Sequence, residues 1–293
     1  MARRQMMVRR AGSVKVGTCA LRLDRARVMG ILNVTSDSFS GDGIVGDEER
    51  VVAKGLVMFE EGADIVDVGG ESTRPGASPV PENLEMVRVV GIVEQLSRAR
   101  PGRVSIDTMK PKVAEAAFFA GASTLNDVSG LGDKRMIEIV AEHGGSVIIM
   151  HMQGEPRTMQ GRPRYKDVVG DIKTFLEERV AAAEAGGIEP RRIMIDPGIG
   201  FGKTLGHNLE ILARLREFKG LGKPIVVGVS RKSFIGKITG APEDKRLEGS
   251  LAAAVLAVRE GADMVRVHDV RETVSALKVA HEILAMSGPG APR

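Results

Sequence analysis

The sequence predicts a single (β/α)8 TIM barrel with a short N-terminal β-hairpin in front of it. Eight short apolar runs rich in Val and Ile recur along the 293 residues, with helical stretches between them. Successive runs lie about 34 residues apart, the size of one strand–helix unit. Apolar runs without polar alternation are typical of parallel strands covered on both faces. Eight such units favour a closed barrel over the alternative, a doubly wound open sheet.

The predicted elements follow one another in regular order along the chain. Strands are expected at 28–33, 65–68, 104–107, 124–127, 147–151, 193–196, 225–229 and 264–268, and the helices between them include 48–61, 82–98, 111–120, 167–185 and 247–260. Gly62, Gly121 and Gly261 each lie three residues before a strand. A glycine at this place is typical of a helix that ends in a left-handed residue.

A basic segment precedes the first barrel strand, with seven arginines between Arg3 and Arg27. Alternating residues at 14–16 and 21–23 predict a short hairpin within it. No linker rich in Ser and Pro divides the rest. We therefore expect a basic arm with the hairpin at 1–27, the barrel at 28–286 and a flexible tail at 287–293.

Composition excludes several classes of protein. Hydrophobic residues make up 43% of the chain and charged residues 27%, which is ordinary for a folded domain. No apolar run approaches the roughly 18 residues of a membrane span. Cys19 is the only cysteine, which excludes an internal disulfide and a Cys-rich metal site. Trp is absent and Tyr165 is the only tyrosine, so bases have few aromatic stacking partners. We expect a cytoplasmic protein that acts on small molecules and binds neither nucleic acid nor membrane.

Polar residues cluster where the predicted strands end. Active sites of (β/α)8 barrels lie at this end of the strands. The polar residues there are Asn33, 71–74, Asp107, Asn126, Asp127, His151, Asp196, Arg231, Lys232, Arg266 and His268.

Asp107, Asn126 and Asp196 follow apolar segments, so we expect their side chains to lie deep in the barrel mouth. A buried carboxylate needs donors or it takes up a proton. A ligand edge with several N–H groups, such as an amino-pyrimidinone ring, would supply donors. A divalent metal or internal pairing with Arg or Lys are the alternatives.

Cations follow the last two strands, where many barrels bind phosphate. Lys232 lies just after the seventh strand, and Arg266 and His268 lie at the end of the eighth. Arg offers a bidentate fork to phosphate oxygens, and imidazole adds a donor. Thr73 and Arg74 lie on a glycine-rich loop at 69–76.

Two other motifs are rejected as nucleotide sites. The Gly-Lys-Thr at 202–204 resembles the end of a phosphate-binding P-loop, but its first glycine would fall at Pro197. The glycines at 198, 200 and 202 lack the helix and acidic partner of a dinucleotide fingerprint. No sequence of the types HExxH or GxSxG occurs. Among the histidines, His143 and His281 are interpreted as structural, and His207 as a cap or packing residue of the sixth helix.

Eight motifs appear in order, one per strand end. They are MGILNVTSDSFS (29–40), GGESTRPG (69–76), SIDT (105–108), NDVSG (126–130), MHMQG (150–154), DPGIGFGKT (196–204), SRKSF (230–234) and RVH (266–268). This set resembles the dihydropteroate synthase family over about residues 28–285. The resemblance implies an Mg²⁺-assisted transferase of folate biosynthesis. It would join p-aminobenzoate to 6-hydroxymethyl-7,8-dihydropterin pyrophosphate and release pyrophosphate.

The resemblance also implies site residues. Asp107, Lys232 and Arg266 would be catalytic, and Asn33 would contact the metal and the pyrophosphate. Substrate-binding residues would be Asp107, Asn126, Asp196 and Lys232 for the pterin, Arg266 and His268 for pyrophosphate, Thr73, Arg74, Phe201 and Ser233 near p-aminobenzoate, and Val128, Met150 and Gly228 elsewhere in the pocket. Sulfonamides would be competitive inhibitors. Family members commonly dimerise, and 252–258 and 277–284 on the last helices are the expected homodimer surface.

The expected chemistry needs no protein nucleophile. The carboxylates accept hydrogen bonds from the pterin, while Arg266, His268 and Mg²⁺ stabilise the negative charge on departing pyrophosphate. An SN1-like methylene cation then reacts with the arylamine.

The first loop departs from the family pattern. Ser36 stands where the family has proline, and Gly41 and Asp42 are exchanged relative to its Asp-Gly. Segment 200–203 shows no insertion, which predicts ordinary sulfonamide sensitivity. Two alternatives remain: a pterin-binding module of a corrinoid methyltransferase system, and an inactive paralogue. The module would not need the cations at 230–234 and 266–268.

Overall fold

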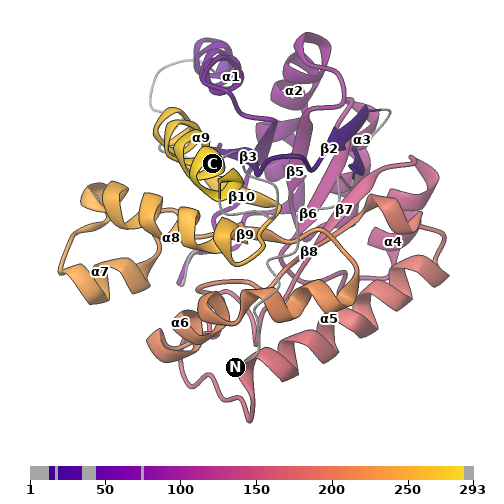
Figure 1. Ribbon diagram of the computed structural model, residues 1–293. Helices are drawn as coiled ribbons and strands as arrows, with labels where there is room; N and C mark the ends of the chain where they lie inside the picture. The colour runs from indigo at the N-terminus through magenta and orange to yellow at the C-terminus, as the bar shows by residue number, and fades with distance from the viewer. Residues whose placement is uncertain (1–12, 17–18, 35–43, 74–75, 287–293) are drawn as a thin grey trace, which may run out of the picture.

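The structure, a computed structural model, describes residues 13–16, 19–34, 44–73 and 76–286. Eight parallel strands form its centre (Figure 1). They are β3 (Arg27–Asn33), β4 (Ile65–Gly69), β5 (Val104–Asp107), β6 (Thr124–Asp127), β7 (Ser146–Met150), β8 (Ile193–Asp196), β9 (Val226–Gly228) and β10 (Met264–Val267). Their order is β8-β7-β6-β5-β4-β3-β10-β9, and a parallel bridge between Ile195 and Ile225 joins the two ends. This confirms the predicted (β/α)8 barrel.

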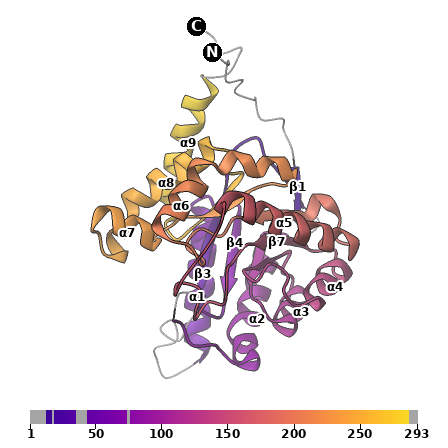
Figure 2. The same ribbon diagram turned by 90° about the horizontal axis from the view of Figure 1, so that it is seen from below.

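Helices surround the strands in both views of the molecule (Figures 1 and 2). They are α1 (Ile44–Glu60), α2 (Glu82–Ala99), α3 (Pro111–Phe119), α4 (Arg135–Glu142), α5 (Val168–Ala185), α6 (Leu205–Ala213), α7 (Ser233–Thr239), α8 (Leu247–Arg259) and α9 (Val270–Ala285), with 3-10 turns at Pro190–Arg192, Leu215–Leu221 and Glu243–Lys245. Within the described ranges, no helix is both long and apolar enough to cross a membrane.

The predicted local signals are confirmed at the helix ends. Gly62, Gly121 and Gly261 have φ angles of 105°, 102° and 110°, a backbone conformation that L side chains rarely adopt. Each therefore lets a helix end and the next strand begin within three residues. At the start of α6, Thr204 accepts a hydrogen bond from the His207 amide, and the His207 ring accepts one from the Thr204 amide. His207 is thus the predicted cap residue.

The N-terminal hairpin closes the amino-terminal end of the barrel. Its strands, β1 (Ser13–Val16) and β2 (Cys19–Arg22), pair antiparallel as predicted. Apolar side chains of the hairpin pack with the residues at the start of the barrel strands: Val14, Val16, Leu21 and Leu23 on one side, and Met29, Ile65, Ile148, Met194, Val226 and Met264 on the other. The functional cavity therefore lies at the opposite, carboxyl-terminal end. The expected arm at 1–12 and the tail at 287–293 lie outside the described residues.

Candidate active site

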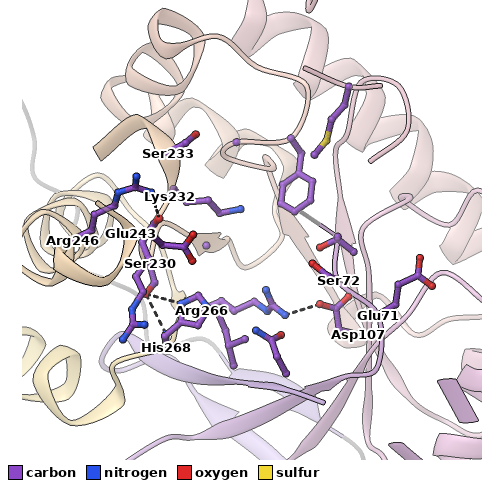
Figure 3. A pocket seen from close by; sticks show the side chains of 18 residues that line it. Glu71, Ser72, Asp107, Ser230, Lys232, Ser233, Glu243, Arg246, Arg266 and His268 are labelled. Atoms are coloured by element: carbon purple, nitrogen blue, oxygen red, sulfur yellow. Dashed lines mark hydrogen bonds and ion pairs between the residues drawn. The ribbon is translucent and has the colours of Figure 1, made fainter. Parts of the chain in front are cut away.

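A cavity of about 340 Å³ opens at the carboxyl-terminal ends of the strands (Figure 3). This is within the ordinary range for small-molecule sites, about 300–1,000 Å³. Many of the predicted site residues lie on its wall: Asn33, Thr73, Asp107, Phe201, Gly228, Lys232, Ser233, Arg266 and His268. Residues more than 230 positions apart in sequence meet there because parallel strands bring all their carboxyl ends to one rim.

The floor of the cavity is built around Arg266. Its Nε donates to Asp67 Oδ2 and its Nη2 to Asp107 Oδ2, each at 2.6 Å. Asn126 Nδ2 donates to the same Asp67 oxygen at 3.0 Å. Asp107 and Asn126 are direct neighbours in the register of β5 and β6. Internal pairing, one of the alternatives for the predicted buried carboxylates, is therefore found for Asp107.

Two carboxyl groups share one guanidinium in this floor. Burial, together with the nearby carboxylate of Asp67, outweighs the attraction of Arg266 and raises the pKa of Asp107 to about 7. The Oδ1 atoms of Asp67 and Asp107 are buried and accept no hydrogen bond from the described residues. A ligand with N–H groups would satisfy the free oxygen of Asp107, which lies on the cavity wall.

Asp196 is the second predicted carboxylate, at the end of β8. Only 6% of its surface is exposed, and its Oδ1 accepts from the Gly198 amide at 2.7 Å. Burial raises its pKa, although that hydrogen bond and the charges of Lys232, Arg266 and Lys203 act in the opposite direction. Asn126 and Asp196, which are 4% and 6% exposed, do not belong to the lining of this cavity.

The opposite wall carries cations. Lys232 Nζ lies 4.1 Å from the centre of the Phe201 ring, a cation–π distance. Arg231 holds the strained φ of 56°, and its guanidinium pairs with Asp269. The Ser250 hydroxyl accepts a hydrogen bond from the Arg231 amide at 2.9 Å. These bonds fix the turn from which Lys232 and α7 begin.

Ser230 positions the last predicted cation. Its hydroxyl accepts from the His268 amide at 3.2 Å and lies 3.1 Å from the His268 Nδ1 atom. The imidazole is thereby held at the end of β10 beside the cavity (Figure 3).

A cluster of charged side chains, partly buried, braces the segment at Glu71 that follows β4. Lys110 bridges Glu71 and Glu85, and the Thr108 hydroxyl donates to Glu85 at 2.7 Å. Glu85 is 1% exposed. The cluster fixes the backbone just before Thr73.

Sequence reasoning missed Asp67, although it contacts both Arg266 and Asn126. The sequence signal for Asp67 was a carboxylate within the apolar run 65–68, because a charge buried in a core strand is unfavourable unless it has a partner. Val128 and Met150, predicted in the pocket, lie in a buried apolar cluster with Met159 and Phe201, which line the cavity; Val128 and Met150 are not themselves in the lining. The part of the chain that the structure describes holds no group of three or more His, Cys, Asp or Glu arranged for a metal ion.

Several predicted features lie outside the described residues. These are Arg74 and the altered first-loop positions Ser36, Gly41 and Asp42.

Comparisons with known proteins show the family to which the chain belongs. A family model described as "Pterin binding enzyme" matches residues 29–268. The dihydropteroate synthase of Escherichia coli K12 is 44% identical over 266 residues, which are 91% of this chain and 94% of that protein.

Two solved structures of dihydropteroate synthases have the same fold as this chain. Dihydropteroate synthase of Xanthomonas albilineans with 4-aminobenzoic acid is 45% identical, with a TM-score of 0.87 over 94% of this chain and 99% of that one. The Yersinia pestis dihydropteroate synthase with a sulfonamide drug is 41% identical, with a TM-score of 0.88 over 93% and 99%. The chain therefore belongs to the dihydropteroate synthase family of pterin-binding enzymes.

Proposed function

We propose that this chain catalyses the dihydropteroate synthase reaction. It joins p-aminobenzoate to 6-hydroxymethyl-7,8-dihydropterin pyrophosphate and gives 7,8-dihydropteroate and pyrophosphate. The observation that carries the proposal is a single cavity whose wall holds the buried carboxylate of Asp107 together with Lys232, Arg266 and His268. The carboxylate fits the N–H edge of a pterin and the cations fit a pyrophosphate.

The pterin would bind at the floor. Asp107 on the cavity wall would accept hydrogen bonds from its amino and ring N–H groups. Asp196 and Asn126, at the ends of β8 and β6, would add an acceptor and an amide deeper in the barrel. These bonds hold the ring with its methylene carbon toward the cations. Because both carboxylates are buried, their charge acts at low local dielectric on positive charge that develops in the ring.

Bond breaking would then follow from the charge distribution. The C–O bond at the methylene breaks, and its electron pair leaves with pyrophosphate toward Lys232, Arg266 and His268. The arylamine nitrogen of p-aminobenzoate donates its lone pair to the methylene carbon and loses a proton to water at the cavity mouth. No side chain needs to act as a nucleophile.

Mg²⁺ fits this rim through a small number of protein ligands. Mg²⁺ typically takes one or two protein oxygens, with water and substrate phosphate completing six positions. The Asn33 amide oxygen, at the end of β3 and on the cavity wall, would hold it next to the pyrophosphate. When bound, the ion would supply positive charge to the leaving group.

We further propose competitive inhibition by sulfonamides. Phe201 and Ser233 lie on the wall where p-aminobenzoate would pack, and sulfonamides share its arylamine ring. Raising the p-aminobenzoate concentration should overcome sulfamethoxazole, and a turnover rate that sulfamethoxazole leaves unchanged would contradict this.

A homodimer through the last two helices is also proposed. Exposed apolar side chains on α8 and α9 support it: Leu256, Val279 and Ile283 are 55%, 60% and 62% exposed. Light scattering should show a dimer that Ile283→Glu dissociates. A cytoplasmic location is proposed because a single cysteine is typical of proteins in reducing compartments.

The test of the reaction measures pyrophosphate release with and without p-aminobenzoate, in the presence of Mg²⁺, together with formation of dihydropteroate. Asp107→Ala should remove turnover, whereas Asp133→Asn, which changes an exposed carboxylate paired with Arg135, should not. Pterin binding without release by the unmodified chain would contradict the proposal and favour the pterin-binding module or the inactive paralogue.

A further inference from the structure

The turn between β8 and α6, residues 198–203, lies directly on the backbone that follows β7. A Cβ at Gly198 would be 1.9 Å from the His151 carbonyl oxygen, and one at Gly202 would be 2.4 Å from that of Gln153. Both glycines also have positive φ, at 71° and 62°. Only glycine permits this approach, so the turn has one defined position on its neighbour.

Within this turn, Lys203 is a buried cation with uncharged partners. Its side chain is 3% exposed. Its ammonium group lies 3.0 Å from His151 Nδ1, 2.9 Å from the Phe201 carbonyl oxygen and 3.4 Å from the His151 carbonyl oxygen. The three donors of the ammonium group therefore meet three acceptors, two of them from the β7 side.

His151 is suited to be an acceptor. Burial and the neighbouring charge of Lys203 lower its pKa to about 3, so the imidazole is neutral near pH 7 and its Nδ1 is free of a proton when Nε2 carries it. Phe175 packs edge-on against the ring, with centroids 4.9 Å apart. The ring is therefore held in place from a second side.

Burial of Lys203 is unfavourable for its charge. Desolvation lowers the pKa of Lys203 to about 7, and Lys232 acts in the same direction, while Asp196 opposes both. A buried charge of this kind adds little to the stability of a fold, and an apolar residue of similar volume is often as stable or more so. Stability alone therefore does not account for a lysine at this position.

The group that Lys203 fixes belongs to the cavity wall. Its bond to the Phe201 carbonyl sets the backbone that carries the Phe201 ring, and this ring meets Lys232 Nζ at 4.1 Å. The Tyr165 hydroxyl adds a bond to the Gly202 carbonyl at 2.8 Å. Lys203 is thus the buried link between β7, the turn and the aromatic part of the wall.

We propose that Lys203, with neutral His151 as its acceptor, is a positioning residue that fixes Phe201 and Lys232 against the arylamine substrate. The inference rests on the proposed function. The hydrogen bonds of Lys203 hold the turn on the p-aminobenzoate side of the cavity, whereas it acts on Asp196 through its charge alone. The larger effect therefore falls on the affinity for p-aminobenzoate.

Lys203→Met tests the proposal because it keeps an unbranched chain out to the ε position and removes the ammonium group with all three donors. We expect the KM for p-aminobenzoate to rise about tenfold, with kcat and the Kd of the pterin within about threefold. Tm should fall by a few degrees at most, because three acceptors lose their donors while a buried charge is also removed. Hydrogen exchange of the amides at 198–204 should become faster. The matched control is Lys219→Met, which removes a partly exposed ion pair with Asp263 outside the cavity and should leave KM unchanged.

The acceptor is tested with two variants of His151. Asn places an oxygen near the position of Nδ1, so His151→Asn should retain a KM close to that of the unmodified chain, whereas His151→Leu should match Lys203→Met. The double variant Lys203→Met/His151→Leu should raise KM no further than either single change, because both break one interaction.

Several outcomes would overturn the inference: an unchanged KM in Lys203→Met, an equal loss of pterin affinity and Tm, or additive effects in the double variant. Absence of turnover in the unmodified chain would instead refute the proposed function. Hydrogen exchange at 198–204 still tests the link in that case, since unchanged exchange in Lys203→Met would refute it without any assay of turnover.

Discussion

Asp67→Asn isolates the charge of the most deeply buried carboxylate in the cavity floor. Asp67 is 0% exposed, and its Oδ2 atom accepts from both Arg266 and Asn126. Asn can keep an oxygen at that place, with its NH2 group at the position of Oδ1, which accepts no hydrogen bond. The geometry of the floor is retained and one negative charge is removed.

The size of the expected change in the pKa of Asp107 follows from the guanidinium that Asp67 and Asp107 share. Asp67 and Asp107 each lie 2.6 Å from a nitrogen of Arg266. Two unit charges about 5 Å apart repel by about 3 kcal/mol at an effective dielectric constant of about 20, which equals roughly two pKa units. Removing this repulsion and leaving Arg266 to Asp107 alone should lower the pKa of Asp107 from about 7 to roughly 5.

Asp67→Asn should extend the activity to lower pH. A carboxylate with a lower pKa remains ionised at lower pH, so the acidic limb of kcat/KM for the pterin substrate should move down by one to two units. Titration of the Asp107 carboxyl carbon by NMR, assigned with Asp107→Asn, gives the same quantity without turnover. A midpoint within about half a unit of the original value would refute the electrostatic account of the floor.

Three further predictions concern the same cavity. Asp107→Asn should abolish turnover yet raise the free energy of unfolding at pH 8 by about 1–3 kcal/mol and leave it unchanged at pH 4. Because the pKa of Asp107 is raised, the folded state of the unmodified chain binds more protons than the unfolded state between pH 4 and pH 8, so its stability falls as the pH rises. Denaturant titrations that give the same gain in unfolding free energy at both pH values would contradict this prediction. Arg266→Lys should lower kcat/KM about 100-fold or more, because one ammonium cannot hold Asp67 and Asp107 as the guanidinium does; a loss below about threefold would show that the bridge is not needed. Removal of Mg²⁺ with EDTA should slow pyrophosphate release at least about tenfold, and Asn33→Ala should raise the Mg²⁺ concentration for half-maximal rate; full activity in EDTA would exclude the metal.

The barrel and much of its rim could be predicted because all strands of a parallel barrel point the same way, so the residue that follows each strand lies at the same end. Each apolar run ends on the same side of a parallel barrel, so a polar residue after a run is placed at the mouth without knowledge of distant contacts. Asp107, Lys232 and His268 were found in this way. The hairpin followed from local alternation alone.

Side-chain partners could not be predicted because they depend on contacts between distant segments. Arg266 bonds to Asp67 and Asp107, which lie 199 and 159 residues away in sequence. The sequence placed Arg266 with the pyrophosphate, a role that stays a prediction, and gave no sign of its attachment to the floor. Asp67 was missed because strand residues alternate between barrel interior and helix layer, and the run 65–68 carries no polar alternation that identifies the face.

The hairpin covers the amino-terminal end of the barrel, and the cavity opens at the carboxyl-terminal end. Both reactants and both products of the proposed reaction would pass through the mouth at the carboxyl-terminal end, and the pterin would bind at the bottom. A p-aminobenzoate molecule that bound first would obstruct the mouth of the cavity. Productive binding would therefore begin with the deeper substrate, and release would begin with the product nearer the mouth. The depth of the cavity alone would thus favour one order of binding and release.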